Sequence, residues 1–375
     1  MSFNGDSSAT GPIHPGAPNP NSPVRWTHNP IITPAQVVPS RPDFEVVGVF
    51  NPGVIRVGDE TRLLLRVAET PRDVPPDEVA SPYYDCAAER IVVRTWKRAT
   101  PGLGTSDSRV ITHDGDTYLS SISHLRWARS SDGRHFDVDT EPALMPADAL
   151  EAFGVEDPRI TLLDGVFWVN YTAVSAAGIA TALACSGDLA TFARKGIIFA
   201  PPNRDVAIFP ERIGGRYLAL HRPMPEGIGR PAIWLASSSD LFSWGDHRVV
   251  AGPRSGMWDD LKIGGGAVPF RVETERGDAW LVIYHGVTTT PLTYSLGALL
   301  LDLDDPSRVL GRSRAPILFP EAPYELNGFF GNVVFSCGVD TEGDGVRVYY
   351  GASDGVTCLA ELSLEWILQG LEHQT

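Results

Sequence analysis

Residues 239–244 read Ser-Asp-Leu-Phe-Ser-Trp, in which an aspartate is followed four residues later by an aromatic residue. The same spacing joins Asp132 to Phe136 and Asp188 to Phe192, so the pattern recurs at steps of 56 and 52 residues. Each copy follows short apolar runs that are separated by turn residues, which indicates β-strands. A repeat of about fifty to sixty residues made of short strands is typical of a β-propeller blade.

The number of blades is open between five and six. Six polar or proline-containing openings precede the strand runs: Asn51-Pro52-Gly53, Asp107-Ser108-Arg109, Asp157-Pro158-Arg159, Phe209-Pro210-Glu211-Arg212, Val268-Pro269-Phe270 and Gly331-Asn332-Val333. The stretch 68–105 is rich in proline and contains one convincing strand, Ile91–Trp96. Residues 51–66 and 107–136 could therefore be two halves of one elaborated blade. A β-sandwich is the alternative all-β fold, but the fixed spacing favours blades.

Outside the repeats, the sequence predicts an arm and a helix. Residues 1–42 are rich in Pro, Gly, Ser and Asn and lack the basic and apolar regions of a secretory signal. We expect an extended arm at 1–42, either disordered or docked on its own or a neighbouring subunit, and one catalytic domain at 43–375. Helical periodicity over 362–371 predicts a short C-terminal helix, and one or two further helices are possible near 147–153.

Composition excludes several classes of function. The net charge of −15 argues against a nucleic-acid partner, because a duplex-binding surface needs an excess of Lys and Arg. No run of eighteen apolar residues occurs, so no membrane span is expected. The four cysteines are widely spaced and form no metal-binding motif, which favours a reduced, cytoplasmic protein without a metal or cofactor.

The propeller prediction brings distant polar residues together. The first strand of each blade lies next to the axis, so its first residues and the ends of the second strands meet at the mouth of the funnel. The residues expected there are Asn51, Arg66, Asp157, Arg159, His221, Arg222, Tyr284, His285, Asn332, Tyr349, Tyr350 and Asp354. This set is polar and rich in Arg and His, and it suits a carbohydrate with an anionic co-substrate.

Two groups of these residues suggest chemistry. Glu156-Asp157 offers paired acids, and cleavage of a sugar bond needs a general acid for the departing oxygen; an aspartate before proline is otherwise a turn cap. Four cationic or cation-capable residues near the predicted strand ends suggest an anion site, since Arg and Lys bind phosphate well. They are Arg204, Arg222, Lys262 and His285. Arg109 and Arg212 are instead expected to pair with acids between blades.

The ordered set of motifs over residues 45–360 resembles glycoside hydrolase family 130, the mannoside phosphorylases and related mannosidases. The motifs include Gly154-Val155-Glu156-Asp157-Pro158-Arg159, Asn203-Arg204-Asp205, His221-Arg222-Pro223, Tyr284-His285-Gly286 and Tyr349-Tyr350-Gly351-Ala352-Ser353-Asp354. The resemblance implies a five-bladed propeller in which Asp157 is the general acid, acting through a sugar hydroxyl. It also implies phosphate binding by Arg204, Arg222, Lys262 and His285. The expected substrate-binding residues are Asn51, Arg66, Glu156, Arg159, Tyr294 and Asp354.

The branches of that family differ in their cations. Phosphorolysis needs cations on the side opposite the acid, whereas hydrolysis needs a carboxylate base there. Because this chain retains all four phosphate-binding positions, we expect inverting phosphorolysis of β-mannosides to α-mannose 1-phosphate, with inorganic phosphate as co-substrate. A β-mannosidase and a non-catalytic sugar-binding propeller remain alternatives. The sequence does not specify β-1,2 or β-1,4 linkage, the acceptor sugar or the oligomeric state, and a homo-oligomer is compatible with the arm.

Overall fold

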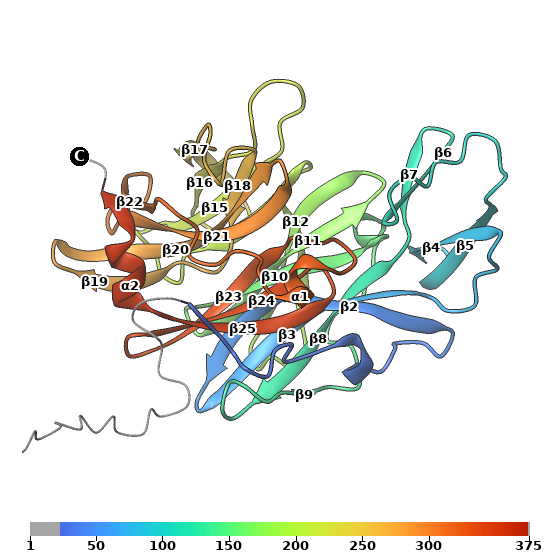
Figure 1. The fold of residues 1–375 in the computed structure, drawn as a ribbon, viewed down its shortest axis with the longest axis horizontal. Helices are drawn as coiled ribbons and strands as arrows, with labels where there is room; N and C mark the ends of the chain where they lie inside the picture. The colour runs from blue at the N-terminus through green and yellow to red at the C-terminus, as the bar shows by residue number, and fades with distance from the viewer. Residues whose placement is uncertain (1–22, 374–375) are drawn as a thin grey trace, which may run out of the picture.

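The computed structural model describes residues 23–373, which form an all-β structure with two short α-helices (Figure 1). The predicted all-β class is therefore confirmed. Four antiparallel groups follow the chain in order. They are β2 (Phe44–Val57), β3 (Glu60–Pro71), β8 (Ile122–Ser130) and β9 (Asp137–Val138); β10 (Gly154–Leu163), β11 (Val166–Ser175), β12 (Gly178–Ser186) and β13 (Ala193–Phe199); β14 (Asn203–Ile208), β15 (Tyr217–Pro223), β16 (Ile233–Ser238) and β17 (Trp244–Ala251); and β18 (Lys262–Gly265), β19 (Phe270–Thr274), β20 (Gly277–Thr289), β21 (Leu292–Asp302), β22 (Val309–Ser313) and β26 (Leu371–His373).

A fifth group joins the two ends of the described chain. It contains β23 (Val334–Glu342), β24 (Gly345–Ala352), β25 (Val356–Ser363) and β1 (Val24–Arg25), with β1 paired to β25. The first two groups are linked by a parallel bridge between Ser123 and Gly154, and no sheet closes on itself within residues 23–373. The helical segments are η1 (Pro34–Gln36), η2 (Ala149–Glu151), α1 (Pro323–Leu326) and α2 (Leu364–Gln369).

Two of the helical segments match positions expected from the sequence, whereas α1 and η1 were not expected. The expected C-terminal helix is α2, and the segment near 147–153 contains the 3₁₀ turn η2. Ser363 caps α2 by accepting a hydrogen bond from the amide of Trp366, and Gly370 ends it. Among the described residues, no helix has the length and apolar character needed to cross a bilayer.

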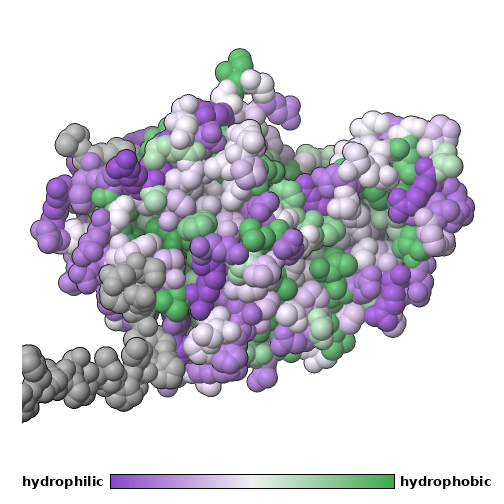
Figure 2. Space-filling model, viewed as in Figure 1, coloured by the Kyte–Doolittle hydropathy of each residue, from purple (hydrophilic) through white to green (hydrophobic). Residues whose placement is uncertain are grey.

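The segment 68–120 is an insertion in the first group. Because β3 pairs directly with β8, residues 51–66 and 122–136 share one sheet, as the elaborated-blade alternative predicted. The opening proposed at Asp107 is wrong, since the strands around it form hairpins of their own. These are β4 (Glu78–Asp85) with β5 (Arg90–Lys97), and β6 (Val110–His113) with β7 (Asp116–Leu119). They form a lobe at the right of Figure 1, set off by a notch in the outline in Figure 2.

Two other predicted openings need correction. The third group begins with β14 at Asn203, before the expected opening at Phe209. The fourth begins with β18 at Lys262, before the expected opening at Val268. In both cases the proline-containing motif follows the strand that leads the group, so it does not mark the start of that group.

The aspartate–aromatic pattern makes the same turn three times, at Asp132, Asp188 and Asp240. In each turn the aspartate Oδ1 accepts two backbone N–H bonds, from the residues two and three positions later. A serine two residues before each aspartate accepts two further backbone N–H bonds. Short polar side chains that satisfy the local backbone favour such turns, which explains why this pattern marks the repeats.

The first strands of three groups carry a matching irregularity. The pairing of the first strand with the second shifts its register by a β-bulge or similar irregularity in each group. The shift falls between Phe50 and Gly53 in β2, between Glu156 and Arg159 in β10, and between Arg204 and Ala207 in β14. At each shift one polar residue has a left-handed backbone, with φ of 48° at Asn51, 49° at Asp157 and 58° at Asp205. Such backbone is costly for residues other than glycine and is concentrated at functional sites. β-Bulges redirect side chains, so the backbone redirects three polar residues at equivalent irregularities in these strands.

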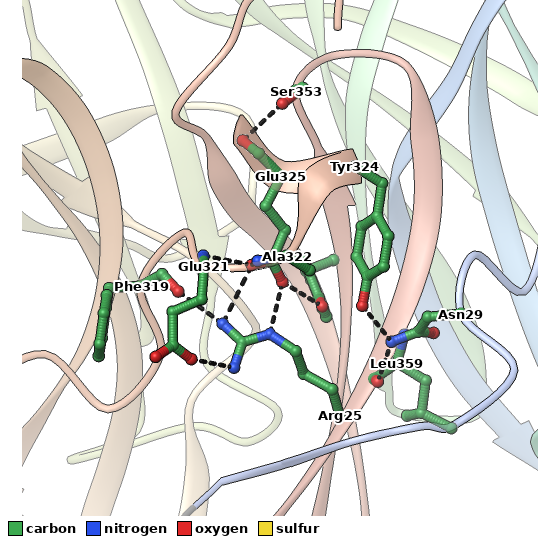
Figure 3. A network of polar contacts seen from close by, with 10 residues as sticks. Arg25, Asn29, Phe319, Glu321, Ala322, Tyr324, Glu325, Ser353 and Leu359 are labelled. Atoms are coloured by element: carbon green, nitrogen blue, oxygen red, sulfur yellow. Dashed lines mark hydrogen bonds and ion pairs between the residues drawn. The ribbon is translucent and has the colours of Figure 1, made fainter. Parts of the chain in front are cut away.

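Residues 23–42 of the predicted arm dock on the chain's own last and first sheet groups: β1 pairs with β25, and the amide of Ser40 donates to Glu69 of β3. Residues 1–22 lie outside the described residues. Figure 3 shows how Arg25 of β1 reaches α1. Its guanidinium donates to Glu325 at 2.8 Å and to Glu321 at 2.7 Å. The Glu325 side chain is fully buried and also accepts from the hydroxyl of Tyr350 at 2.7 Å. Arg25 therefore links the arm to the segment that leads into β23.

Replacing Arg25 with alanine should lower the free energy of unfolding by about 2–3 kcal/mol, because a buried carboxylate loses its charged partner. Urea unfolding measures this loss. Lys97→Ala is the matched control, since the pair between Lys97 and Asp77 is exposed and such pairs contribute about 1 kcal/mol or less. Equal effects of the two substitutions would contradict an anchoring role for Arg25.

Candidate active site

A polar pocket of about 120 Å³ contains nine of the eleven residues for which the sequence predicts a catalytic, phosphate-binding or substrate-binding role. Five further residues expected at the mouth of the funnel do not line it: His221, Tyr284, Asn332, Tyr349 and Tyr350. Its lining combines residues from the first strands, the second-strand ends and the insertion. The lining residues are Asn51, Arg66, Arg109, Asp157, Arg204, Asp205, Arg222, Lys262, His285, Tyr294, Phe330, Val333, Phe335 and Asp354. Five Arg or Lys side chains face three carboxyl groups here, so the pocket is locally cationic in a chain of net charge −15. Such a site attracts anions.

Asp157 is held in the pocket by Asn51 and Arg66. Its Oδ1 accepts hydrogen bonds from Asn51 Nδ2 at 2.9 Å and from Arg66 Nη1 at 3.2 Å. Arg66 also donates to Glu156 at 2.7 Å, and its guanidinium lies 4.6 Å from the centre of the Phe50 ring. Within residues 23–373 no hydrogen bond uses Asp157 Oδ2, so this oxygen is available to a ligand.

Carboxyl groups near Asp157 have raised pKa values. Burial raises the pKa of Glu156, against the attraction of Arg66. Burial also raises the pKa of Asp354 to about 6, opposed by Arg66 and reinforced by Asp157. Displaced pKa values of this kind are typical of acid–base sites.

A second cluster in the pocket gathers cationic side chains around Asp205. Arg222 Nη1 lies 2.9 Å from Asp205 Oδ2 and 3.0 Å from His285 Nε2. Lys262 Nζ lies 5.0 Å from the ring centre of Tyr294, whose ring stacks with His285. Burial alone would raise the pKa of Asp205, but Arg222 and its cationic neighbours hold it at about 2. Asp205 therefore stays ionised and orients Arg222.

The protonation of His285 follows from the same contacts. Burial lowers its pKa to about 3, although Asp205 opposes the shift. A neutral ring that accepts from Arg222 at Nε2 carries its proton on Nδ1. In the described part of the chain, His285 Nδ1, Arg222 Nε and Arg204 Nε are buried without a hydrogen-bond partner. Unsatisfied buried donors are costly, so this cationic cluster is a candidate anion site.

Glu156 and Arg159 lie outside this pocket. Glu156 lines an adjoining cavity of about 370 Å³. Arg159 is 1% exposed and donates to the carbonyl oxygens of Gly266 at 2.6 Å and Gly265 at 2.9 Å. The structure therefore does not bring Arg159 to the pocket surface. Instead, the Arg159 side chain links β10 to the end of β18 by hydrogen bonds. Arg212, as expected, pairs with an acid of a neighbouring group, at 3.7 Å from Asp164.

Comparison with known proteins identifies the family. The model of glycoside hydrolase family 130, described as β-1,4-mannooligosaccharide phosphorylase, matches residues 108–373. The chain belongs to glycoside hydrolase family 130. A β-1,2-mannobiose phosphorylase of Listeria innocua is 45% identical over 93% of this chain and 98% of that protein. A second β-1,2-mannobiose phosphorylase, from a Thermoanaerobacter species, is 41% identical over 88% of this chain and 94% of its own length.

A solved structure supports the same relationship. The Listeria innocua β-1,2-mannobiose phosphorylase in complex with β-1,2-mannobiose superposes with a TM-score of 0.88 at 44% identity, covering 93% of this chain and 98% of that one. The resemblance to family 130 inferred from the ordered motifs is thus confirmed. Because the two chains superpose over nearly their full lengths, this family 130 member has the family's fold throughout the described catalytic region.

Sequence reasoning missed two charged pocket residues in this family 130 chain, Asp205 and Arg109. Asp205 occupies the same bulge position in β14 as Asn51 does in β2 and Asp157 in β10. Aligning these three strand starts, instead of placing the third at Phe209, would have found it. Arg109 was assigned to the framework, and it does pair with Asp107, but it also lines the pocket. Only the fold of the insertion reveals that position.

The raised pKa of Asp354 predicts a pH-dependent effect on stability. A group whose folded pKa of about 6 exceeds its ordinary value of 3.8 favours the folded state when protonated, and this contribution is lost as pH rises through 6. Asp354→Asn should therefore be about 2–3 kcal/mol more stable than wild type at pH 8 and equally stable near pH 4. Urea unfolding at both pH values measures this. The exposed Asp59→Asn serves as control, and a constant difference across pH would contradict the buried-charge explanation.

Proposed function

We propose that this protein is an inverting β-mannoside phosphorylase whose preferred substrate is β-1,2-mannobiose. Inorganic phosphate, bound among Arg204, Arg222, Lys262 and His285, attacks the anomeric carbon of the terminal mannose. The bond from that carbon to the glycosidic oxygen breaks as its bond to phosphate oxygen forms. Asp157 supplies the proton to the leaving oxygen, relayed by a sugar hydroxyl. The products are α-mannose 1-phosphate and mannose.

One observation carries this proposal: an acid and a cluster of cationic side chains, some of whose nitrogens lack a hydrogen-bond partner, line a single pocket. An inverting displacement places the nucleophile and the acid on opposite faces of the sugar. Arg222 suits phosphate because its planar guanidinium can donate two parallel hydrogen bonds. Lys262 adds a point charge, and Tyr294 beneath it limits where the ammonium group can move.

Hydrolysis fits the same pocket less well. It requires a carboxylate base near the position from which water attacks. Within the described residues that line the pocket, Asp205 is the carboxylate at the cationic end. A carboxylate whose pKa lies at about 2 is a weak base, and its oxygens already face Arg222. The cations thus favour phosphate over activated water as the nucleophile. The third possibility, a non-catalytic sugar-binding protein, gives no reason for the unsatisfied donors.

We also infer that the five antiparallel groups are the five blades of one propeller. Each group contributes a meander, and β1 of the arm would complete the last blade. The shared bulge at Asn51, Asp157 and Asp205 supports this inference, because equivalent positions of successive blades would then surround one axis. The same geometry explains how residues more than 300 positions apart, Asn51 and Asp354, line one pocket.

The proposed reaction needs no metal or cofactor, because side-chain cations carry the charge of phosphate. The partners proposed are phosphate and a small oligosaccharide, without nucleic acid or membrane, and the compartment proposed is the cytoplasm. All four cysteines are free, which suits a reducing compartment. A homo-oligomer remains compatible with this arrangement.

A comparison of substrates tests the linkage. With phosphate present, β-1,2-mannobiose should yield mannose 1-phosphate with a kcat/KM at least tenfold higher than β-1,4-mannobiose. The basis is the similarity over almost the full chain to β-1,2-mannobiose phosphorylases. A tenfold preference for the β-1,4 substrate would contradict this part of the proposal while leaving phosphorolysis intact.

A further inference from the structure

The pocket opens into a second, larger cavity on the side of the acid. This cavity, of about 370 Å³, shares Arg66, Arg109, Arg204 and Asp354 with the first pocket. It is also lined by Glu156, which follows the same bulged strand as Asp157. None of Arg222, Lys262 and His285 lines it. Arg204 thus lines both cavities, while the other three proposed phosphate-binding residues line only the first pocket. The larger cavity lies next to Glu156 and the insertion, where it offers room for a leaving sugar.

Arg109 lies where the two cavities meet. It comes from the insertion, immediately before β6, and its guanidinium is held by the carboxylate of Asp107. Arg109 Nε donates to Asp107 Oδ1 at 3.0 Å, and Nη2 donates to Oδ2 at 2.8 Å. The Arg109 backbone amide donates to the same carboxylate at 2.9 Å. These two side-chain bonds use Nε and Nη2 and orient the Arg109 guanidinium. Its third nitrogen, Nη1, takes no part in the ion pair and can donate to a ligand.

The guanidinium plane of Arg109 packs over an aromatic ring. Its guanidinium carbon lies 4.2 Å from the centre of the Phe330 ring. The amide of Phe330 in turn donates to the carbonyl oxygen of Ser353 at 3.1 Å, next to Asp354. Gly328 is packed so tightly that an added Cβ would lie 2.4 Å from Ser353 Cβ. The insertion and the segment after α1 thus meet in a rigid wall, and stacking of this kind stabilises a cation.

We propose that Arg109 is a specificity-determining residue that binds the leaving sugar, and that the insertion at 68–120 thereby selects the acceptor in the reverse reaction. This inference rests on the proposed phosphorylase function. Arg109 Nη1 donates to hydroxyl oxygens of the sugar in the larger cavity, while Asp107 and Phe330 position the guanidinium. Hydroxyls accept readily from a charged donor, and prior orientation lowers the entropy cost of that contact.

The test separates the leaving sugar from the other reactants. In the synthetic direction, with α-mannose 1-phosphate as donor and mannose as acceptor, Arg109→Ala should raise the KM for mannose about 10- to 100-fold, the value of hydrogen bonds to a charged group. The KM for α-mannose 1-phosphate, and that for phosphate in the forward direction, should stay within twofold of wild type. Asp107→Asn, which loosens the guanidinium, should raise the acceptor KM by a smaller factor.

Arg94→Ala provides the matched control. Arg94 belongs to the same insertion and lies over aromatic rings, 5.0 Å from the centre of Trp96, but it lines neither the pocket nor the adjoining cavity. Its removal should leave the acceptor KM unchanged. If Arg109→Ala does not fold, Arg109→Lys keeps the charge without the planar fork and should raise the acceptor KM in the same direction.

The outcomes distinguish this inference from the function on which it rests. A wild-type protein that makes no mannose 1-phosphate would overturn the phosphorylase function itself. An active wild type whose acceptor KM is unaffected by Arg109→Ala would overturn only the role of Arg109. A rise in the phosphate KM as large as that for the acceptor would likewise overturn it, since Arg109 would then act on the whole pocket.

Discussion

Asp157→Asn should lower kcat for phosphorolysis of β-1,2-mannobiose by about 10²- to 10⁴-fold, the usual contribution of a general acid. Asparagine keeps an Oδ1 that accepts from Asn51 and Arg66, so the geometry of the site is retained while the transferable proton is lost. The KM for phosphate should change little, because the cationic end of the pocket is untouched. Initial rates of mannose 1-phosphate formation measure both constants.

Asp164→Asn is the control for this substitution. Asp164 lies in the turn between β10 and β11 and also has a left-handed backbone, with φ of 51°, but its side chain is 65% exposed. Its replacement should leave kcat within twofold of wild type. If Asp157→Asn also retained turnover within tenfold, the assignment of Asp157 as the acid would be wrong.

Arg222→Ala should raise the KM for phosphate at least 100-fold, because a charge-assisted pair of hydrogen bonds to the anion is lost. The same change should destabilise the free protein by about 3 kcal/mol, since it removes the nearest charged partner of the buried Asp205. Phosphate-dependent initial rates and urea unfolding measure the two effects separately.

A double variant distinguishes binding from folding. Asp205→Asn combined with Arg222→Ala should recover most of the lost stability, because no uncompensated carboxylate remains, but the KM for phosphate should stay high. Arg248→Ala, which removes an exposed arginine of β17, should alter neither property. Recovery of phosphate affinity in the double variant would contradict direct binding by Arg222.

The sequence predicted the class of fold and nine of the residues that line the pocket, because the strands, turns and motifs that carry them are local patterns. The turns at Asp132, Asp188 and Asp240 are specified by a few consecutive side chains that bond to their own backbone. Asn51, Asp157 and Asp354 could be placed together because strands of one repeat have equivalent positions. The two α-helices are short, and the C-terminal one was visible from its apolar periodicity.

What the sequence did not predict depends on contacts between distant segments. Arg159 has the position of a site residue but turns to the carbonyl oxygens of Gly265 and Gly266, which no local pattern specifies. Arg109 pairs with an acid two residues away, as a framework residue would, yet the insertion carries that pair to Phe330 and the pocket. The start of the third strand group was misplaced because the proline motif at Phe209 resembled an opening.

The central claim is that phosphate, not water, accepts the mannosyl group with inversion. NMR of the first products formed from β-1,2-mannobiose tests it most directly, in parallel reactions with and without phosphate. The structure predicts α-mannose 1-phosphate and mannose in equal amounts when phosphate is present, and no cleavage without it. Release of mannose at the same rate in the absence of phosphate, or formation of the β-anomer of mannose 1-phosphate, would contradict the account.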